Sequence, residues 1–139
     1  CRERLQAAGF DPEIQVTYDR TAAQPGAGLA VFAETDTGCI FGADRSGELR
    51  RSSEEIGDYV ARTLLDDIRS GATVDRHLAD QLVLFGALAT GETEYIAPQV
   101  TDHLETACWL VGEILGAEAV IHDRKVRVRG VGFRRPGNG

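Results

Sequence analysis

The sequence lacks methionine altogether and contains one tryptophan, three cysteines and four prolines in 139 residues. Because Cys1, Cys39 and Cys108 are few, odd in number and far apart, we expect no disulfide framework and a reducing, cytoplasmic location. The chain also has no apolar run of the ~18 residues that a membrane helix needs, and no charged-then-apolar signal segment opens it. We therefore expect no membrane among its partners.

Positive charge is in short supply. Fifteen Lys and Arg residues stand against 22 Asp and Glu residues, which gives a formal net charge of −7. Proteins that coat nucleic acid without regard to sequence depend on an excess of basic side chains, so this balance argues against that class while allowing a local basic patch. What is present is an ordinary folded composition, with 42% hydrophobic and 27% charged residues. The length fits one domain or slightly more.

The chain opens in what its composition predicts to be the last turn of a helix, stopped by Gly9. A helix without a beginning leads us to expect the C-terminal part of a longer protein. Further helices are predicted at residues 52–70, 74–89 and 101–115. The first of these opens with a capping box formed by Ser52 and Glu55. The second is apolar all round in its later half, so that half should be buried on every side.

Alternating apolar and polar residues predict strands at residues 13–19, 29–34, 39–41, 92–97, 117–121 and 125–131. A loop rich in glycine and polar residues is expected at residues 42–51. From residue 39 onward the order is strand, helix, helix, strand, helix, strand, strand. This order predicts an α/β chain of the α+β sandwich type, in which helices pack on one face of a small mixed sheet.

A composition break near residues 42–47 predicts where the chain divides. The expected units are residues 1–43 and residues 44–133, followed by a frayed tail at residues 134–139. Both candidate sites then lie in the second unit.

The first candidate site is the beginning of the predicted helix at residues 74–89. Helical spacing places His77, Asp80 and Gln81 on one face, while Leu78 and Phe85 lie on another. A carboxylate and an amide at the entrance of a buried helix need partners, because unpaired polar groups are costly to bury. They could cap a neighbouring loop, or they could form a pocket wall in which Asp80 supplies a hard oxygen ligand.

The second candidate is His103, in the first turn of the predicted helix at residues 101–115. The positive end of a helix opposes protonation of an imidazole and favours a bound anion beside it. An uncharged imidazole is the nucleophilic form, and the free amides of the turn would stabilise a phosphoryl group attached to it. The alternative is a surface or capping histidine. The three histidines and three cysteines do not show the close paired spacing of a zinc site.

Two stretches resemble one known family. Residues 77–82 (HLADQL) and the apolar residues after them are similar to the nucleotide-site helix of the RNA 3′-terminal phosphate cyclase family. Residues 100–106 (VTDHLET) resemble the segment that carries its nucleophilic histidine. The resemblance runs from about Leu5 to Val131 and implies the C-terminal part of such a protein. Residues 1–43 would then be part of an inserted smaller α/β domain, followed by the closing sheet-and-helix unit.

The resemblance implies a chemistry. Such cyclases use ATP to convert an RNA 3′-phosphate into a 2′,3′-cyclic phosphate through a covalent histidine–AMP intermediate, which is nucleophilic catalysis. It implies that His103 is the catalytic nucleophile and that a divalent metal, Mg²⁺ or Mn²⁺, binds near Asp80. The residues that it assigns to ATP binding are His77, Leu78, Ala79, Asp80 and Gln81. The implied partners are RNA 3′-phosphate ends, ATP and the N-terminal units of the same protein.

Two other functions are compatible with the same fold. A relative without catalytic activity would serve as an RNA- or protein-binding scaffold in ribosome assembly, and such relatives are expected to lack a histidine at position 103. The second of these functions is that of a sheet-and-helix transferase acting on small phosphorylated metabolites. Residues 78–81 (LADQ) disfavour this function.

Overall fold

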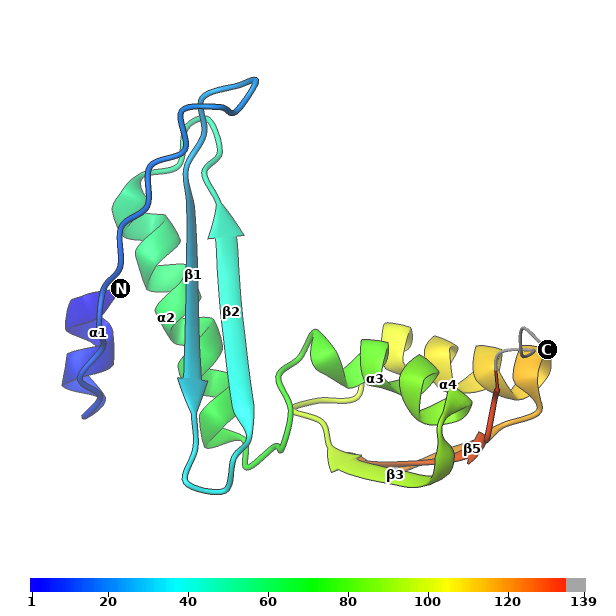
Figure 1. Ribbon diagram of the computed structural model, residues 1–139. Coiled ribbons are helices and arrows are strands. Elements are labelled where there is room, and N and C mark those ends of the chain that lie inside the picture. The colour runs from blue at the N-terminus through cyan, green and yellow to red at the C-terminus, as the bar shows by residue number, and fades with distance from the viewer. Residues whose placement is uncertain (135–139) are drawn as a thin grey trace. The chain divides into compact units, whose positions relative to one another are not determined.

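A computed structural model describes residues 1–134 of the chain, with the elements labelled in Figure 1. The helices are α1 (Arg2–Ala7), α2 (Ser53–Arg69), α3 (Leu78–Leu88) and α4 (Asp102–Leu115). The strands are β1 (Gly28–Glu34), β2 (Ile40–Ser46), β3 (Thr90–Ile96), β4 (Glu118–His122) and β5 (Lys125–Val131). No helix in this described part of the chain is long and apolar enough to cross a membrane. Apart from Arg134, the predicted tail at residues 134–139 lies outside the described residues.

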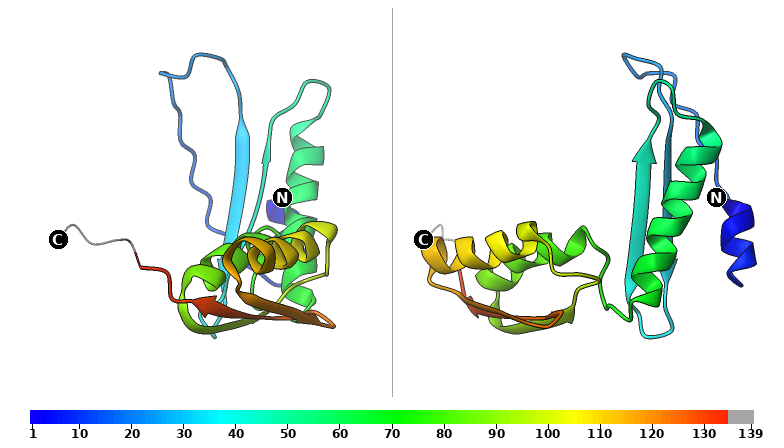
Figure 2. Two further views of the ribbon diagram at one scale, coloured as in Figure 1. Left: turned by 90° about the vertical axis from the view of Figure 1, so that its right-hand side faces the viewer. Right: turned by 180° about the vertical axis from the view of Figure 1, so that it is seen from behind.

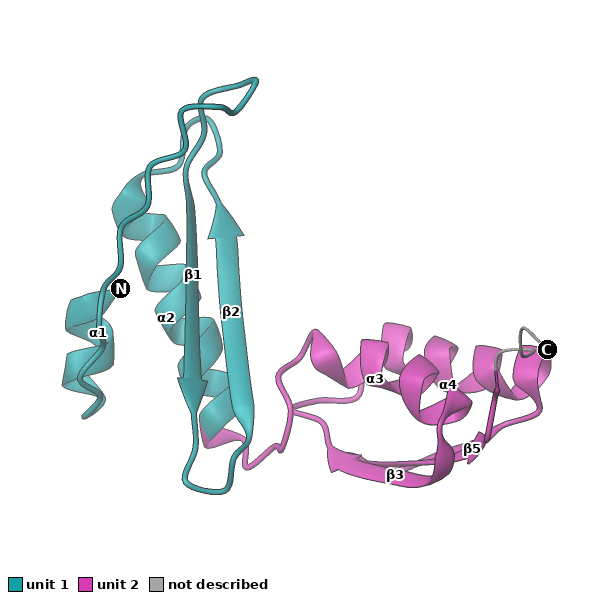
Figure 3. Cartoon of the chain, viewed as in Figure 1, with its two compact units in different colours: residues 1–68 teal, residues 69–139 magenta. Residues whose placement is uncertain are grey.

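The chain divides into two compact units after Ile68 (Figure 3). The sequence pattern predicts this division after residue 43, at the start of a polar loop. The structural division falls later because α2 packs with the first unit. The guanidinium of Arg45 in β2, for example, lies 4.2 Å from the centre of the Tyr59 ring in α2.

In the first unit, β1 and β2 form a two-stranded antiparallel sheet, and α2 lies along one face of it (Figure 2). The register extends as far as Gly28 opposite Ser46. Residues 42–46 are therefore strand, where the sequence pattern predicts a loop. Glycine and charged residues weaken the strand signal there, but each of these residues pairs with a residue of β1.

The predicted capping box at the start of α2 is confirmed. The backbone N–H of Ser52 donates to Oε2 of Glu55 over 2.8 Å, and the backbone N–H of Glu55 donates to Oγ of Ser52 over 3.2 Å. The buried apolar side chains of this helix include Val60, Leu64 and Leu65. Leu5 of α1 and Phe41 and Ala43 of β2 are also buried in this unit.

The strand predicted at residues 13–19 is wrong. These residues adopt no regular secondary structure. The side chains that suggest a strand, Ile14, Val16 and Tyr18, are 56%, 67% and 85% exposed. Alternating apolar and polar residues are typical of a strand with one buried face, but a strand also needs a neighbouring strand to pair with. Residues 13–19 pair with no strand among the described residues.

In the second unit, three antiparallel strands form a sheet in the order β3-β5-β4. Helices α3 and α4 lie together on one face of this sheet (Figure 1, Figure 2). The α+β class and the one-sided helix packing are thus as predicted, whereas the predicted mixed sheet is wrong, because both sheets of the described residues are antiparallel. The core between helices and sheet includes Val83, Leu104, Val126 and Val128, each at most 1% exposed.

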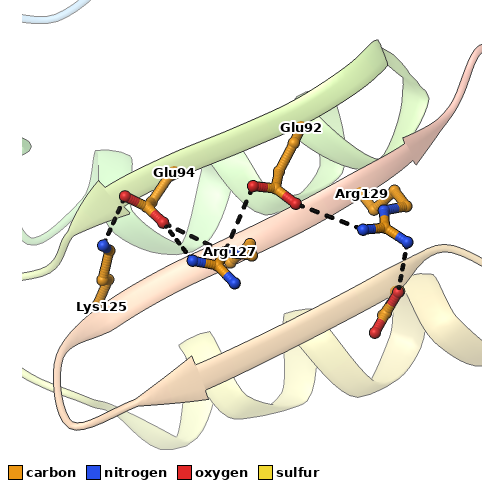
Figure 4. Close-up of polar contacts among 6 residues, drawn as sticks. Glu92, Glu94, Lys125, Arg127 and Arg129 are labelled. Atoms are coloured by element: carbon orange, nitrogen blue, oxygen red, sulfur yellow. Dashed lines mark hydrogen bonds and ion pairs between the residues drawn. The ribbon is translucent and has the colours of Figure 1, made fainter.

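The other face of this sheet carries charge (Figure 4). Because side chains alternate along a strand, Val126 and Val128 point to the core while Lys125, Arg127 and Arg129 point away from it. The cations contact carboxylates on the neighbouring strands: Lys125 to Glu94, Arg127 to Glu92 and Glu94, and Arg129 to Glu92 and Glu118. Hydrogen bonds from Lys125 and Arg127 hold the pKa of Glu94 below its usual range. This face is therefore a charge-balanced surface.

Helix α3 and strand β5 approach each other closely at Gly130. A Cβ atom built there would lie 2.5 Å from the carbonyl oxygen of Gly86 and closer still to that of Ala89. Glycine is thus required by space, since its missing side chain lets the end of the helix rest on the strand.

Candidate functional site

The beginning of α3 is fixed by Asp75. Its Oδ1 accepts hydrogen bonds from the backbone N–H groups of His77 and Leu78, at 2.9 and 2.8 Å. An aspartate that binds the first amides of a helix acts as a cap. The helix therefore starts at Leu78 and not at residue 74 as the sequence pattern predicts, because the cap holds residues 75–77 in a turn.

The beginning of α4 is fixed by Thr101. Its Oγ1 accepts a hydrogen bond from the backbone N–H of Leu104 over 3.2 Å, so that Thr101 and not Asp102 is the N-cap. His103 is the second residue of the helix, and its side chain is exposed. The imidazole therefore stands in the first turn, where backbone N–H groups have no partner within the helix and favour an anion.

A groove of about 630 Å³ runs between α3 and α4. Its lining residues are Asp80, Gln81, Leu84, Phe85, His103, Thr106, Ala107, Leu110 and Val111. The groove brings His103 together with Asp80 and Gln81, although 21 intervening residues of sequence separate the two groups. It offers an imidazole, a carboxylate and an amide at one surface.

The remaining residues that the resemblance assigns to ATP do not line this groove. His77 is exposed at the start of α3, and Leu78 follows it with a partly exposed side chain. Ala79 is buried, and its carbonyl oxygen accepts a hydrogen bond from the hydroxyl of Tyr95 in β3. Burial, with smaller contributions from Cys108 and Asp80, raises the pKa of Tyr95. The tyrosine therefore stays a neutral donor and fixes the turn of α3 that carries Asp80.

The apolar half of the groove corrects one expectation. The sequence predicts that the later half of α3 is buried on every side, but Leu84 and Phe85 are 50% and 66% exposed. The predicted placement of Phe85 on a different face from Asp80 is also wrong, because both line the groove. A uniformly apolar run shows no exposed face in the sequence, so periodicity could not reveal this surface.

On α4 the groove is also lined by Thr106, Ala107 and Leu110, which the sequence motifs do not single out. They follow His103 at spacings of three, four and seven residues, which is the spacing of one helical face. Their position could therefore be inferred from the predicted helix once His103 was chosen.

Asp80 is the one carboxylate among the groove residues. No group of three or more His, Cys, Asp or Glu residues that could hold a metal ion occurs in residues 1–134. Mg²⁺ commonly uses only one or two protein carboxylates and takes further oxygens from substrate phosphates and water. The donor set of the groove, Asp80 with the amide oxygen of Gln81, fits a metal held in this way.

Arg124 holds the loop that leads to α4. Its Nη1 lies 3.1 Å from the carbonyl oxygen of Ser70, 3.2 Å from that of Ala97 and 3.3 Å from that of Pro98. The loop is also fixed by the backbone N–H of Ala97, which donates to the carbonyl oxygen of Arg124 over 2.9 Å. The start of α4, and with it His103, is thus tied to the β4–β5 turn.

We expect Arg124→Met to lower the free energy of unfolding by about 1–3 kcal/mol, because it keeps only the unbranched stem of the side chain and removes the donor to three carbonyl groups. Urea unfolding of the full-length protein would measure the loss. Arg127→Met is the matched control, since Arg127 contacts only exposed carboxylates on the outer face of the sheet and should cost less than about 1 kcal/mol. Equal losses in both variants would contradict a special role for Arg124.

Comparisons with known proteins agree with the sequence resemblance. The family model described as the insert domain of RNA 3′-terminal phosphate cyclase matches residues 1–69. The chain is 33% identical over 137 residues to a protein of Pyrobaculum neutrophilum named RNA 3′-terminal phosphate cyclase, which covers 96% of this chain and 40% of the relative. Proteins of the same name from Caldivirga maquilingensis and Thermococcus onnurineus are 35% and 39% identical, covering 92% and 84% of this chain and 38% and 33% of the relatives.

The chain thus spans about 40% of the length of the first of these relatives. The matched insert domain ends at residue 69, next to the division between the two units after Ile68. Together, the family match over the first unit and the relatives that align over both units show that the chain belongs to the RNA 3′-terminal phosphate cyclase family.

Proposed function

We propose that this chain carries the nucleotide-binding groove and the nucleophile of an ATP-dependent RNA 3′-terminal phosphate cyclase. The observation that carries the proposal is the groove between α3 and α4, which gathers His103, Asp80 and Gln81 at one surface. An imidazole in the first turn of a helix, opposite a carboxylate and an amide, suits the attack of a nitrogen on a phosphate group. The family name supplies the substrate class, RNA with a 3′-terminal phosphate.

The proposed first step is the adenylation of His103. An imidazole nitrogen attacks the α-phosphorus of ATP, the bond from that phosphorus to the bridging oxygen breaks, and pyrophosphate leaves with the electron pair. The N–H groups of the first turn of α4 lie beside the attacking ring and favour the negative charge of the phosphate. Gln81 can both donate to and accept from the nucleotide.

The later steps transfer AMP and close the ring. An oxygen of the RNA 3′-phosphate attacks the adenylated phosphorus and the imidazole leaves. The neighbouring 2′-hydroxyl then attacks the RNA phosphorus, loses its proton, and displaces AMP. Adenylation thus turns a poor leaving oxygen into a good leaving group.

Asp80 would hold Mg²⁺ or Mn²⁺, which supplies positive charge to the phosphates when bound. We place the reaction in the cytoplasm, because all three cysteines are free thiols.

The experiment incubates the full-length protein that carries this chain with ATP labelled at the α-phosphate and denatures the product. We expect label on the protein, and conversion of a 3′-phosphorylated RNA to a cyclic end when RNA is added. A well-folded protein that takes up no label and cyclises no RNA would contradict the proposal. Such a result would favour the scaffold function in ribosome assembly.

A further inference from the structure

A second polar pocket lies in the first unit, beside the start of α2. It has a volume of about 370 Å³, at the small end of the range of ligand pockets. Its lining residues are Arg45, Arg51, Glu55, Ile56, Asp58, Tyr59 and Arg62. We call it the arginine pocket. Three of the fifteen basic residues of an acidic chain line this pocket, together with one aromatic residue.

The guanidinium groups of the arginine pocket are largely available. Arg45 stacks over Tyr59 at 4.2 Å, which restricts the guanidinium without using its N–H groups. Neither Arg45 nor Arg62 forms an ion pair with a carboxylate of the described residues. Arg51 contacts Glu48 over 3.1 Å, but both side chains are well exposed and such pairs are weak.

The carboxylates that line the pocket are already engaged elsewhere. Glu55 accepts the backbone N–H of Ser52 in the capping box, and Asp58 forms an ion pair with Arg4 of α1. The lining holds three arginines against two carboxylates, and one of these, Asp58, is shared with Arg4. The local balance is therefore positive, in contrast to the outer face of the second sheet, where Lys125, Arg127 and Arg129 each contact a glutamate.

Guanidinium groups bind phosphates through paired N–H donors, and an aromatic ring beside them suits a nucleotide. We propose that the arginine pocket binds the phosphodiester backbone of the RNA strand whose 3′ end is the substrate. The proposal rests on the proposed function for the identity of the RNA. Backbone contacts carry no sequence information, so this site would hold strands of any sequence.

The test measures binding of a fluorescent single-stranded RNA with a 3′-phosphate to the full-length protein by anisotropy, over a series of salt concentrations. We expect Arg45→Gln and Arg62→Gln each to weaken binding on the order of tenfold at low salt. The slope of log affinity against log salt should become less negative by about 0.7 for each phosphate that the variant no longer neutralises. Arg127→Gln removes the same charge from a paired position and should leave both quantities unchanged.

Two results would overturn the proposal: unchanged RNA binding in Arg62→Gln, a substitution at an exposed position of α2, or equal losses in Arg127→Gln. A further arm separates RNA from ATP as the source of the phosphate. Labelling by ATP in the absence of RNA should be the same in wild type and variants, and its selective loss in Arg45→Gln and Arg62→Gln would assign the pocket to the nucleotide instead. If wild type takes up no label but the variants lose RNA binding, the adenylation proposal fails and this inference stands.

Discussion

His103→Ala is expected to abolish the labelled adduct that the full-length protein forms with α-labelled ATP, by a factor of at least about a thousand. The imidazole stands in the first turn of α4 and faces the groove that Asp80 and Gln81 line. Alanine removes both ring nitrogens, one of which must form the bond to phosphorus in this mechanism, so ATP binding would persist while the adduct would not. RNA cyclisation should fall by the same factor, because every later step needs the adduct.

The control is His122→Ala, at a histidine that is 89% exposed in β4 and outside the groove. This variant should form the adduct at the rate of wild type. The label itself gives a second check, because a bond between phosphorus and nitrogen is cleaved by acid and resists alkali. Label that persists in His103→Ala, or that resists acid in wild type, would show that another residue is the nucleophile.

Gly130→Ala is expected to destabilise the second unit strongly, by about 3 kcal/mol or more. The added methyl group would meet the carbonyl oxygens of Gly86 and Ala89, both backbone atoms at the end of α3. Because these atoms cannot rotate away as a side chain can, either the helix or the strand must shift. Thermal or urea unfolding of the full-length protein would show the loss, accompanied by a lower yield of folded protein.

Gly112→Ala is the matched control, since it adds the same methyl group in the middle of α4. A Cβ there would lie 3.6 Å from the carbonyl oxygen of Ala117, an ordinary contact distance. Alanine favours a helix over glycine by about 0.5–1 kcal/mol, so this variant should be slightly more stable than wild type. If both substitutions changed stability by similar amounts, the close contact at Gly130 would not be what limits the packing of α3.

Local signals in the sequence predict two helix boundaries correctly. Ser52 and Glu55 open α2 as their spacing indicates, and Gly116 ends α4 in the left-handed conformation that glycine permits. The start of α3 was missed because Asp75, rather than the periodic apolar residues, determines it. Gly91, two residues after the end of that predicted helix, lies in β3 with a φ of +96°.

Pairing between distant segments was harder to predict. Residues 13–19 alternate like a strand and pair with nothing among the described residues, while residues 42–46 contain glycine and charge and are paired throughout. Pairing depends on what lies beside a segment in the fold, and one segment of sequence does not contain that information. The exposed side of α3 at Leu84 and Phe85 was missed for the same reason.

The candidate site was predicted in part. The sequence singled out His103, Asp80 and Gln81, and the structure gathers the three in one groove; their roles remain predictions. It could not show that His77, Leu78 and Ala79 lie away from that groove, because the resemblance covered the stretch as a whole. The hydrogen bonds of Tyr95 and Arg124 could not be predicted from the sequence either, since each of these residues contacts a segment far from it along the chain.

The groove residues of α4 share one helical phase, and this limits how the gene can change. Each residue turns a helix by about 100°, so a single codon inserted between His103 and Thr106 would rotate the imidazole away from the wall formed by Ala107 and Leu110. An insertion before Thr101 would leave the phase intact. Length variation among natural homologues should therefore collect ahead of the helix and spare its first two turns.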